Sequence, residues 1–210
     1  MENFFKISES NLSKAAEMWA RAFYDGAFYV WIIPDPEIRP ELLKEFFLFR
    51  LRLGILYGDV YVTSNFEAGA CWIPSFNVAI SDERLNKAGV VEFSSKLYAA
   101  DPSAIERLMQ YVNITEPLHE KFAPYPHLYL SSIAVDPIFQ RQGFGSTLLE
   151  AMIKRVDNEN LPLYLETNSK DNISFYERFG FAVREHLIIP DSDIPLWIMI
   201  RSHFKTSPPR

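Results

Sequence analysis

The chain has 210 residues, a length that suits one domain with a sizeable hydrophobic core. Hydrophobic residues make up 48% and charged residues 23% of it, a composition that excludes an intrinsically disordered protein. The net charge of -6 argues against general nucleic-acid binding, and the single cysteine, Cys71, excludes a disulfide framework within the chain.

The N-terminal segment predicts a strand followed by a helix. An apolar run from Phe4 to Ile7 predicts the strand, and Ser10 and Asn11 are capping residues that open a helix ending near Gly26. The aromatic segment FYVWIIPDP comes next and ends in two prolines. We expect this segment to be a loop.

A second helix and a pair of strands complete the first part of the chain. The helix is expected from Glu37 to Tyr57, where Pro40 is tolerated because it lies in the early turns. Strands are expected at 59–64 and 68–73, on either side of a short turn. The predicted order is therefore strand, helix, helix, strand, strand.

Residues 75–126 are predicted to form a helical insertion within the domain, because no flexible linker flanks them. Helical patterns cover 81–100 and the residues after Asp101-Pro102, where the aspartate offers an N-cap and the proline suits the first helical position. The segment 116–126 contains three prolines. We expect that segment to be a loop.

The second half is organised around an apolar strand at 127–135 and the motif Q-x-x-G-x-G that begins at Gln140. A strand that is apolar on both faces is typical of a sheet covered by helices. The two glycines let the chain turn sharply where a helix begins, and the unpaired N–H groups and dipole at that end favour an anion. Arg141 adds a full positive charge. The simplest ligand is a phosphate or pyrophosphate, although a turn without a ligand also fits this motif alone.

Two common phosphate-binding patterns fail on spacing. The P-loop pattern G-x-x-x-x-G-K-[ST] is absent, and only the first two glycines of the dinucleotide pattern G-x-G-x-x-G are present. A strand, a short helix and a hairpin follow, expected at 161–167, 172–179, 181–189 and 194–201. We expect a single domain over 1–204 and a disordered tail at 205–210.

Two motifs resemble those of the GCN5-related N-acetyltransferases, the GNAT superfamily. The stretch from Ile133 to Val156 resembles their acetyl-CoA loop, in which V-D-P ends a strand and Q/R-x-x-G-x-G/A precedes a helix. The segment YLETNSKDNISFYERFGF resembles their pattern L-E-V…N…Y-x-x-x-G-F, with matches at Glu166, Asn172, Tyr176, Gly180 and Phe181. One departure is Ser169, which stands where the family usually has an asparagine. The run NISFYERFGF is most similar to the puromycin N-acetyltransferase branch.

The resemblance implies an α/β (α+β) GNAT fold and an acetyl-CoA-dependent N-acetyltransferase. The fold has a central mixed, mostly antiparallel sheet of about seven strands flanked by helices, here with the 75–126 insertion before the central strand. The acetyl-CoA arm is expected along the strand before the loop, and its pyrophosphate at the loop itself. The residues expected to bind this cofactor are Ile133, Ala134, Val135, Gln140, Arg141, Gln142, Gly143, Phe144, Gly145, Ser146, Asn172 and Tyr176.

Acetyl transfer from a thioester to an amine needs a proton acceptor for the amine and a proton donor for the sulfur. By the resemblance, Glu166 is the expected base, directly or through water, although a glutamate that only pins the following loop also fits its position. Tyr176 is expected to donate a proton to the sulfur, the alternative being a tyrosine that packs against the cofactor. Backbone N–H groups near Ser132 and Ile133 are expected to polarise the thioester carbonyl.

The acceptor is expected to be a primary amine on a small molecule; the alternatives are a protein N-terminus or lysine, or a non-catalytic acyl-CoA sensor. Aromatic side chains suit an amine with a bulky apolar body. The candidates are Phe23, Tyr24, Phe28, Tyr29, Trp31 and Trp72.

We expect no metal, because the four histidines lack the spacing of metal ligands. We also expect a cytoplasmic monomer or homodimer without membrane or nucleic-acid partners. The start of the chain lacks the features of a signal peptide, and no run of about 18 apolar residues is present.

Overall fold

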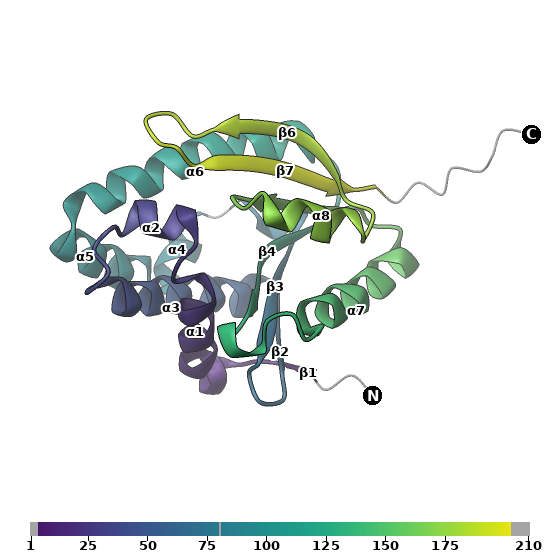
Figure 1. Ribbon diagram of the computed structural model, residues 1–210, viewed down its shortest axis with the longest axis horizontal. Helices are drawn as coiled ribbons and strands as arrows, with labels where there is room; N and C mark the ends of the chain where they lie inside the picture. Colours follow the sequence, from purple (N-terminus) through teal and green to yellow (C-terminus); the bar gives the residue numbers. More distant parts are fainter. Residues whose placement is uncertain (1–3, 80, 203–210) are drawn as a thin grey trace, which may run out of the picture.

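The computed structural model describes residues 4–79 and 81–202, and the tail predicted at 205–210 lies outside them. A seven-stranded sheet forms its centre, in the spatial order β1-β2-β3-β4-β5-β7-β6 (Figure 1). The strands are β1 (Phe4–Lys6), β2 (Asp59–Thr63), β3 (Ala68–Pro74), β4 (Leu128–Val135), β5 (Leu163–Thr167), β6 (Ala182–Ile188) and β7 (Pro195–Arg201). The predicted α/β fold with a mixed, mostly antiparallel sheet is confirmed.

The pair β4–β5 is parallel, whereas the other neighbouring strands of the sheet pair antiparallel. Parallel neighbours need a crossover connection. Here α7 (Phe144–Glu159) supplies it, and its residues Leu148, Leu149, Met152 and Val156 are buried. The helical spacing in the sequence therefore marks the face of α7 that covers the sheet.

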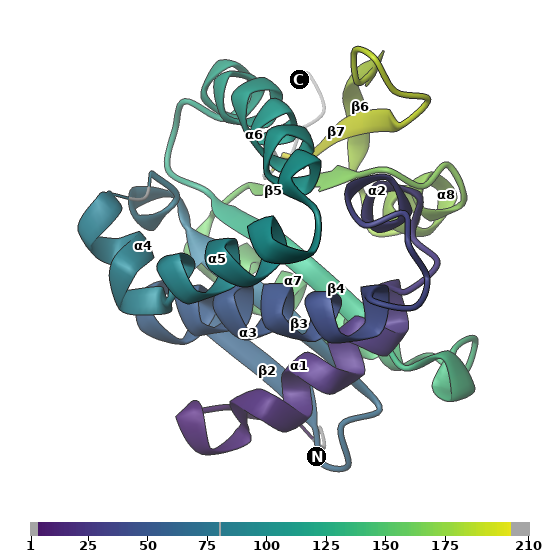
Figure 2. The ribbon, with the colours of Figure 1, turned by 90° about the vertical axis from the view of Figure 1, so that its left-hand side faces the viewer.

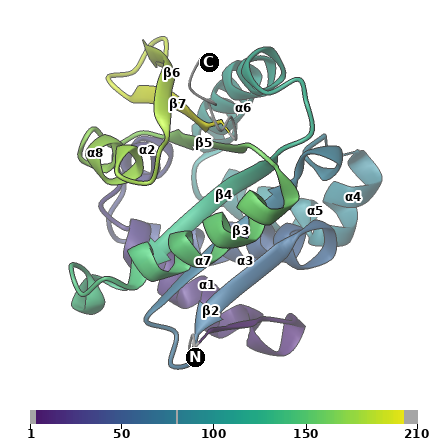
Figure 3. The same ribbon diagram turned by 90° about the vertical axis from the view of Figure 1, so that its right-hand side faces the viewer.

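Helices cover both faces of the sheet (Figures 2 and 3). On one face lie α1 (Glu9–Phe23), α3 (Arg39–Tyr57), α4 (Asp82–Ala88) and α5 (Val90–Ala100). On the opposite face lies α7. The larger hydrophobic cluster forms between the sheet and the first group of helices, and a smaller cluster forms beneath α7 and α8 (Asp171–Glu177).

The helix α3 explains why the residues of the predicted insertion are helical. Apolar residues occur all around α3, and such a helix is stable only when it is buried on more than one side. Its inner side packs on β2 and β3, and α4 and α5 cover its outer side. Phe49 of α3, for example, stacks in parallel on Phe93 of α5 at 5.4 Å between ring centroids.

Two segments that were predicted to be loops are helical. The aromatic segment contains α2 (Ala27–Ile32), because Phe28 and Ile32 lie one turn apart and are both buried. The helix α6 (Pro102–Phe122) continues through Pro117 into the predicted loop at 116–126. A proline removes one hydrogen bond from the helix and its ring crowds the carbonyl four residues earlier, but the buried residues Thr115 and His119 hold the chain in place on either side of it.

No helix within residues 4–79 and 81–202 is long and apolar enough to cross a membrane.

Candidate active site

A β-bulge in β4 opens the centre of the sheet. Cys71 pairs with Ser132 and Trp72 pairs with Leu130, so Ser131 has no partner in β3. A bulge bends its strand, and the pairing of β4 with β5 indeed ends at Leu130. Beyond this point the two parallel strands diverge and leave an edge of β4 unpaired toward β5.

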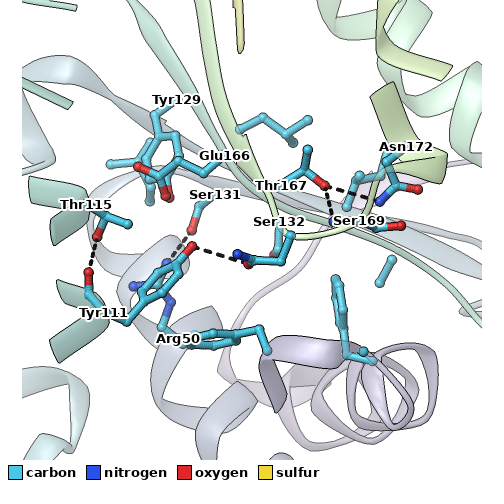
Figure 4. Close-up of a pocket in the computed structure, with 18 of the residues that line it drawn as sticks. Arg50, Tyr111, Thr115, Tyr129, Ser131, Ser132, Glu166, Thr167, Ser169 and Asn172 are labelled. Atoms are coloured by element: carbon cyan, nitrogen blue, oxygen red, sulfur yellow. Dashed lines mark hydrogen bonds between the residues drawn. The ribbon is translucent and has the colours of Figure 1, made fainter. Parts of the chain in front are cut away.

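The bulge also turns two consecutive serines toward the helices on one face. Trp19 of α1 donates its indole N–H to Ser132 Oγ at 3.0 Å. Arg50 of α3 donates from Nη2 to Ser131 Oγ at 2.8 Å (Figure 4). In a regular strand these side chains would point to opposite faces.

The loop between β4 and α7 has the geometry that an anion site requires. Arg141 has a φ of 62° and Gly143 a φ of 90°, so the turn before the helix is left-handed at both residues. The first hydrogen bond of α7 runs from Thr147 N to Gly143 O. The three preceding N–H groups, of residues 144–146, therefore have no partner within the helix and point out of its end.

The opening between β4 and β5 leads into a cavity of about 2180 Å³. Most of the residues predicted to bind acetyl-CoA line it, namely Ile133, Ala134, Val135, Gln140, Arg141, Gly143, Phe144, Gly145, Ser146, Asn172 and Tyr176. Gln142 is the exception, because its side chain donates to the Ile138 carbonyl at 3.1 Å and does not line the cavity. The site therefore gathers residues from the loop before α7, from β4 and from α8.

Arg141, Lys170 and Arg178 line the cavity at its α7 and α8 end. At this end Asn172 donates from Nδ2 to Thr167 Oγ1 at 3.4 Å, which ties α8 to the end of β5. Three cations and the N-terminal N–H groups of α7 together form a surface that suits phosphate groups.

Glu166 lies where β4 and β5 separate, and two phenols hold it. Tyr164 donates to Oε1 at 2.9 Å, and Tyr129 donates to Oε2 at 3.1 Å. Burial raises the pKa of Glu166; the hydrogen bonds from Tyr164 and Tyr129 and the charge of Arg50 act in the opposite direction but do not cancel it. A carboxylate with a raised pKa that faces a cavity is suited to accept a proton.

Tyr176 lies on α8 with its ring almost fully buried. The ring makes edge-to-face contacts with Phe175 and Phe181. Burial raises the pKa of Tyr176 well above the ordinary value. Within the described residues, every fully buried polar side-chain atom has a hydrogen-bond partner. The Tyr176 hydroxyl makes no hydrogen bond to these residues, so it is not fully buried and must open into the cavity that Tyr176 lines. The phenol therefore stays protonated and is available to donate a hydrogen bond.

Three of the six aromatic residues predicted for the acceptor pocket line the cavity. Phe23, Phe28 and Tyr29 form part of its wall on the side of α1 and α2. Phe28 packs against Tyr111 of α6 with 4.3 Å between ring centroids. The aromatic wall therefore extends into the predicted insertion.

The other three aromatic residues predicted for the pocket do not line the cavity. Trp72 is buried beneath α7 in the smaller cluster, on the opposite face of the sheet, because alternation along β3 points Cys71 and Ile73 toward the larger cluster instead. Tyr24 donates its hydroxyl to the Pro36 carbonyl at 3.3 Å and does not line the cavity. Trp31 packs against Phe28 outside the cavity wall.

Several cavity residues carry chemistry that the sequence did not indicate. They are Arg50, Tyr111, Tyr129 and Ser131, of which Arg50 comes from α3 (Figure 4). One signal was present in the sequence, since Arg50 and Arg52 interrupt the apolar run of a helix that must be buried, and a buried arginine needs a polar environment. The position of that environment depends on the bulge in β4, which has no sequence signature.

A pair of histidines lies in another part of the cavity wall. His119 Nε2 and His127 Nε2 are 2.7 Å apart, and both rings are buried. Within the described part of the chain, no group of three or more histidine, cysteine or acidic side chains is placed to hold a metal ion.

Comparisons with known proteins agree with this architecture. A family model described as the acetyltransferase (GNAT) family matches residues 92–181. An uncharacterized N-acetyltransferase of Schizosaccharomyces pombe is 24% identical over 201 residues, which cover 93% of this chain and 81% of that protein.

Two solved structures are similar to the whole fold. A Corynebacterium glutamicum protein described as histone acetyltransferase HPA2 and related acetyltransferase has a TM-score of 0.63 and 20% identity, and the match covers 99% of this chain and 100% of that one. Arylalkylamine N-acetyltransferase 2 from Aedes aegypti has a TM-score of 0.58 and 10% identity over 96% of this chain and 98% of its own.

Proposed function

Because this chain belongs to the GNAT superfamily of N-acetyltransferases, we propose that it transfers the acetyl group of acetyl-CoA to a primary amine on a small molecule while both substrates are bound. The observation that carries this proposal is the opening between β4 and β5. It connects the loop before α7, whose geometry suits an anion, with Glu166 and Tyr176 in the same cavity.

The chain's own residues fit acetyl-CoA. The N–H groups at the start of α7, together with Arg141, would hold the pyrophosphate. The unpaired edge of β4 would hold the pantetheine arm by backbone hydrogen bonds, as an added strand does. Acetyl-CoA supplies an acetyl group activated as a thioester.

Glu166 and Tyr176 have complementary roles in the proposed transfer. The amine nitrogen forms a bond to the acetyl carbon, and the bond from that carbon to sulfur breaks. Glu166 takes one proton from the nitrogen, directly or through water, and the sulfur leaves as a thiolate that receives a hydrogen bond from Tyr176. Because burial raises the pKa of Tyr176, the phenol stabilises the thiolate by this hydrogen bond, and solvent supplies the proton of the free thiol.

The cavity wall supports a small acceptor. The helices α2 and α6 meet at this wall, where Phe28 packs against Tyr111 and closes one side of the cavity. The closer resemblance to the puromycin branch, the cytoplasmic location and the oligomeric state stay predictions.

The proposed function is tested first by binding and then by turnover. Titration with acetyl-CoA is expected to give saturable binding, and release of the CoA thiol over a library of primary amines is expected to identify acceptors. The Tyr176→Phe variant should keep its acetyl-CoA affinity and lose about 100-fold in turnover, because it loses only the hydroxyl.

Tyr98→Phe provides the matched control, because Tyr98 is exposed on α5 and does not line the cavity. Absence of acetyl-CoA binding by the wild type would remove the proposal. An unchanged rate in Tyr176→Phe would restrict Tyr176 to packing. Saturable binding without any transfer would favour an acyl-CoA sensor.

A further inference from the structure

Arg50 is a cation that lines the cavity without an acidic partner. Its Nη2 donates to Ser131 Oγ at 2.8 Å, and none of the ion pairs among residues 4–79 and 81–202 includes it. Because the buried polar side-chain atoms of this part of the chain all have partners, the other N–H groups of Arg50 must be open to the cavity. Figure 4 shows its guanidinium beside Ser131.

Two other arginines with little exposure, Arg39 and Arg201, differ from Arg50. Arg39 donates to the carbonyls of Ile33 at 2.7 Å and Pro34 at 2.6 Å. Arg201 makes two hydrogen bonds to the carboxylate of Asp157. The hydrogen bonds of those two side chains connect separate parts of the fold, whereas most of the N–H groups of Arg50 donate no hydrogen bond within the described residues.

A free guanidinium in this position has a physical cost. Arginine keeps its charge in proteins, and a partly buried charge without a counter-ion destabilises the fold. The carboxylate whose charge acts on it, that of Glu166, is already held by Tyr129 and Tyr164. A ligand that carries a negative group would supply the missing counter-charge.

We propose that Arg50 binds a carboxylate of the acceptor, so that the acceptor is an amine that also carries a carboxylate. This inference rests on the proposed function and specifies its substrate class. A carboxylate fits because it accepts two parallel hydrogen bonds from the planar guanidinium.

The charges in the cavity support an acceptor with both groups. The ammonium of the incoming amine is attracted to Glu166, and the carboxylate to Arg50. An amine without a carboxylate would bring a second positive charge near Arg50, which is unfavourable in a cavity of low dielectric constant. An amino acid leaves both protein charges paired.

The rest of the acceptor is expected to be apolar. Tyr29 and Tyr129 line the cavity together with Arg50, and Phe28 and Tyr111 belong to the same wall. Such a wall suits an aromatic or aliphatic side chain. The proposed acceptor class is therefore an amino acid with an apolar side chain, or a close analogue.

Matched acceptor pairs test this proposal. Phenylalanine is compared with phenethylamine, tyrosine with tyramine, and tryptophan with tryptamine, by release of the CoA thiol. The wild type is expected to favour the carboxylated member by about 10- to 100-fold in kcat/KM, the range that a hydrogen bond between charged groups provides. In Arg50→Gln the two members of each pair are expected to react about equally.

Arg52→Gln is the matched control, because it removes the same charge from the same helix and Arg52 does not line this cavity. A wild type that does not distinguish the two members, an Arg50→Gln variant that still does, or a control that loses the distinction each overturns the proposal. If Arg50→Gln does not fold, Arg50→Met replaces it, since methionine is unbranched and flexible and carries no charge. An unchanged preference in Arg50→Met then overturns the proposal.

A binding measurement separates failure of this inference from failure of the proposed function. Calorimetric titration compares 3-phenylpropionate with 3-phenylpropanamide, which differ in charge but not in shape. Tighter binding of the carboxylate to the wild type and not to Arg50→Gln supports the anion site even if no amine is acetylated. Equal binding overturns the anion site, whereas the acetyl-CoA titration alone decides whether the cofactor binds.

Discussion

The environment of Glu166 determines how the transfer should depend on pH. Burial raises the pKa of Glu166, so this side chain stays protonated over a wider acidic pH range than an ordinary glutamate. While it is protonated it cannot accept a proton. The reaction needs the carboxylate, and an alkyl ammonium also has to lose a proton with a pKa near 10.4. The rate should therefore rise with pH as Glu166 ionises.

Glu166→Gln is expected to lower kcat/KM by about 100-fold at neutral pH, the usual contribution of a general base. The loss should shrink at high pH, because the free amine then needs less help to lose its proton. A pH–rate profile of the variant beside the wild type measures both effects. Glu120→Gln is the control, since Glu120 is exposed on α6 at the cavity wall. A profile in Glu166→Gln that keeps its acidic limb would assign the base to water or to another group.

Residues of the site were predictable where a local pattern marks them. The loop glycines, Glu166 and Tyr176 lie in two short motifs, and the structure brings them to one cavity. Trp72 could not be assigned correctly, because a strand that is apolar on both faces has no periodicity that distinguishes the faces. Arg50 was missed for a different reason: its partner Ser131 lies 81 positions away in the chain.

At the scale of elements, α1 is held on the sheet by a contact that only glycine allows. Trp19 is fully buried, and its indole lies against Gly69 of β3. A side chain at Gly69 would overlap this indole and would also approach the Tyr61 carbonyl oxygen to 2.8 Å. The same indole donates to Ser132 beside the bulge, so this packing contact also supports the opening in the sheet.

Gly69→Ala is therefore expected to destabilise the protein by about 1–3 kcal/mol, the usual cost of overpacking a core. Urea unfolding monitored by tryptophan fluorescence measures this loss. Gly145→Ala is the control, because a Cβ there meets Val135 at an ordinary 3.5 Å. Equal free energies of unfolding for the two variants would show that α1 can move away from β3 without loss of stability.

Helices and strands were predictable where the buried residues recur at one regular spacing along the sequence. The helix α7 shows such a period, and both its existence and its buried face were expected. Proline and aromatic content misled the prediction at α2 and α6, because tertiary burial of Phe28, Ile32, Thr115 and His119 outweighs local preference there. A single sequence does not show which neighbours will cover those residues.

On the scale of the whole molecule, the predicted insertion closes one side of the cavity. Phe93 and Leu97 of α5 belong to the same hydrophobic cluster as Leu43 and Phe47 of α3. We infer from this shared core that residues 75–126 are part of one domain. Removing them would expose α3 as well as the cavity wall.

The histidine pair connects this region to the sheet. His119 lies on α6 and His127 immediately before β4. His127 Nδ1 lies 2.7 Å from the Tyr125 carbonyl oxygen, which can only accept, so Nδ1 carries a proton. In its neutral form His127 then accepts at Nε2 from the Nε2–H of His119.

Acid should weaken this connection. Burial, and next the nearby His127, lower the pKa of His119 to about 4; burial also lowers the pKa of His127, against the hydrogen bond to Tyr125. A base whose pKa is lower in the folded protein than in the unfolded chain contributes stability above the unfolded value, near 6.5, that is lost as pH falls toward the folded value. The raised pKa of Glu166 acts in the opposite direction over part of this range, because protonation of that group favours the folded state.

The pH dependence of unfolding can therefore be assigned only with variants. In a Glu166→Gln background, the free energy of unfolding is expected to fall by on the order of 2 kcal/mol between pH 6.5 and pH 4, since one pKa unit corresponds to about 1.4 kcal/mol. Adding His119→Phe keeps a ring against Tyr164, 3.9 Å away between centroids. This variant should be less stable at neutral pH, because His127 loses its donor, and its stability should depend less on pH. His186→Phe, whose ring stacks on Trp197, controls for the substitution itself. Urea unfolding at several pH values measures the slopes, and parallel slopes with and without His119 would show that this pair does not link acid to unfolding.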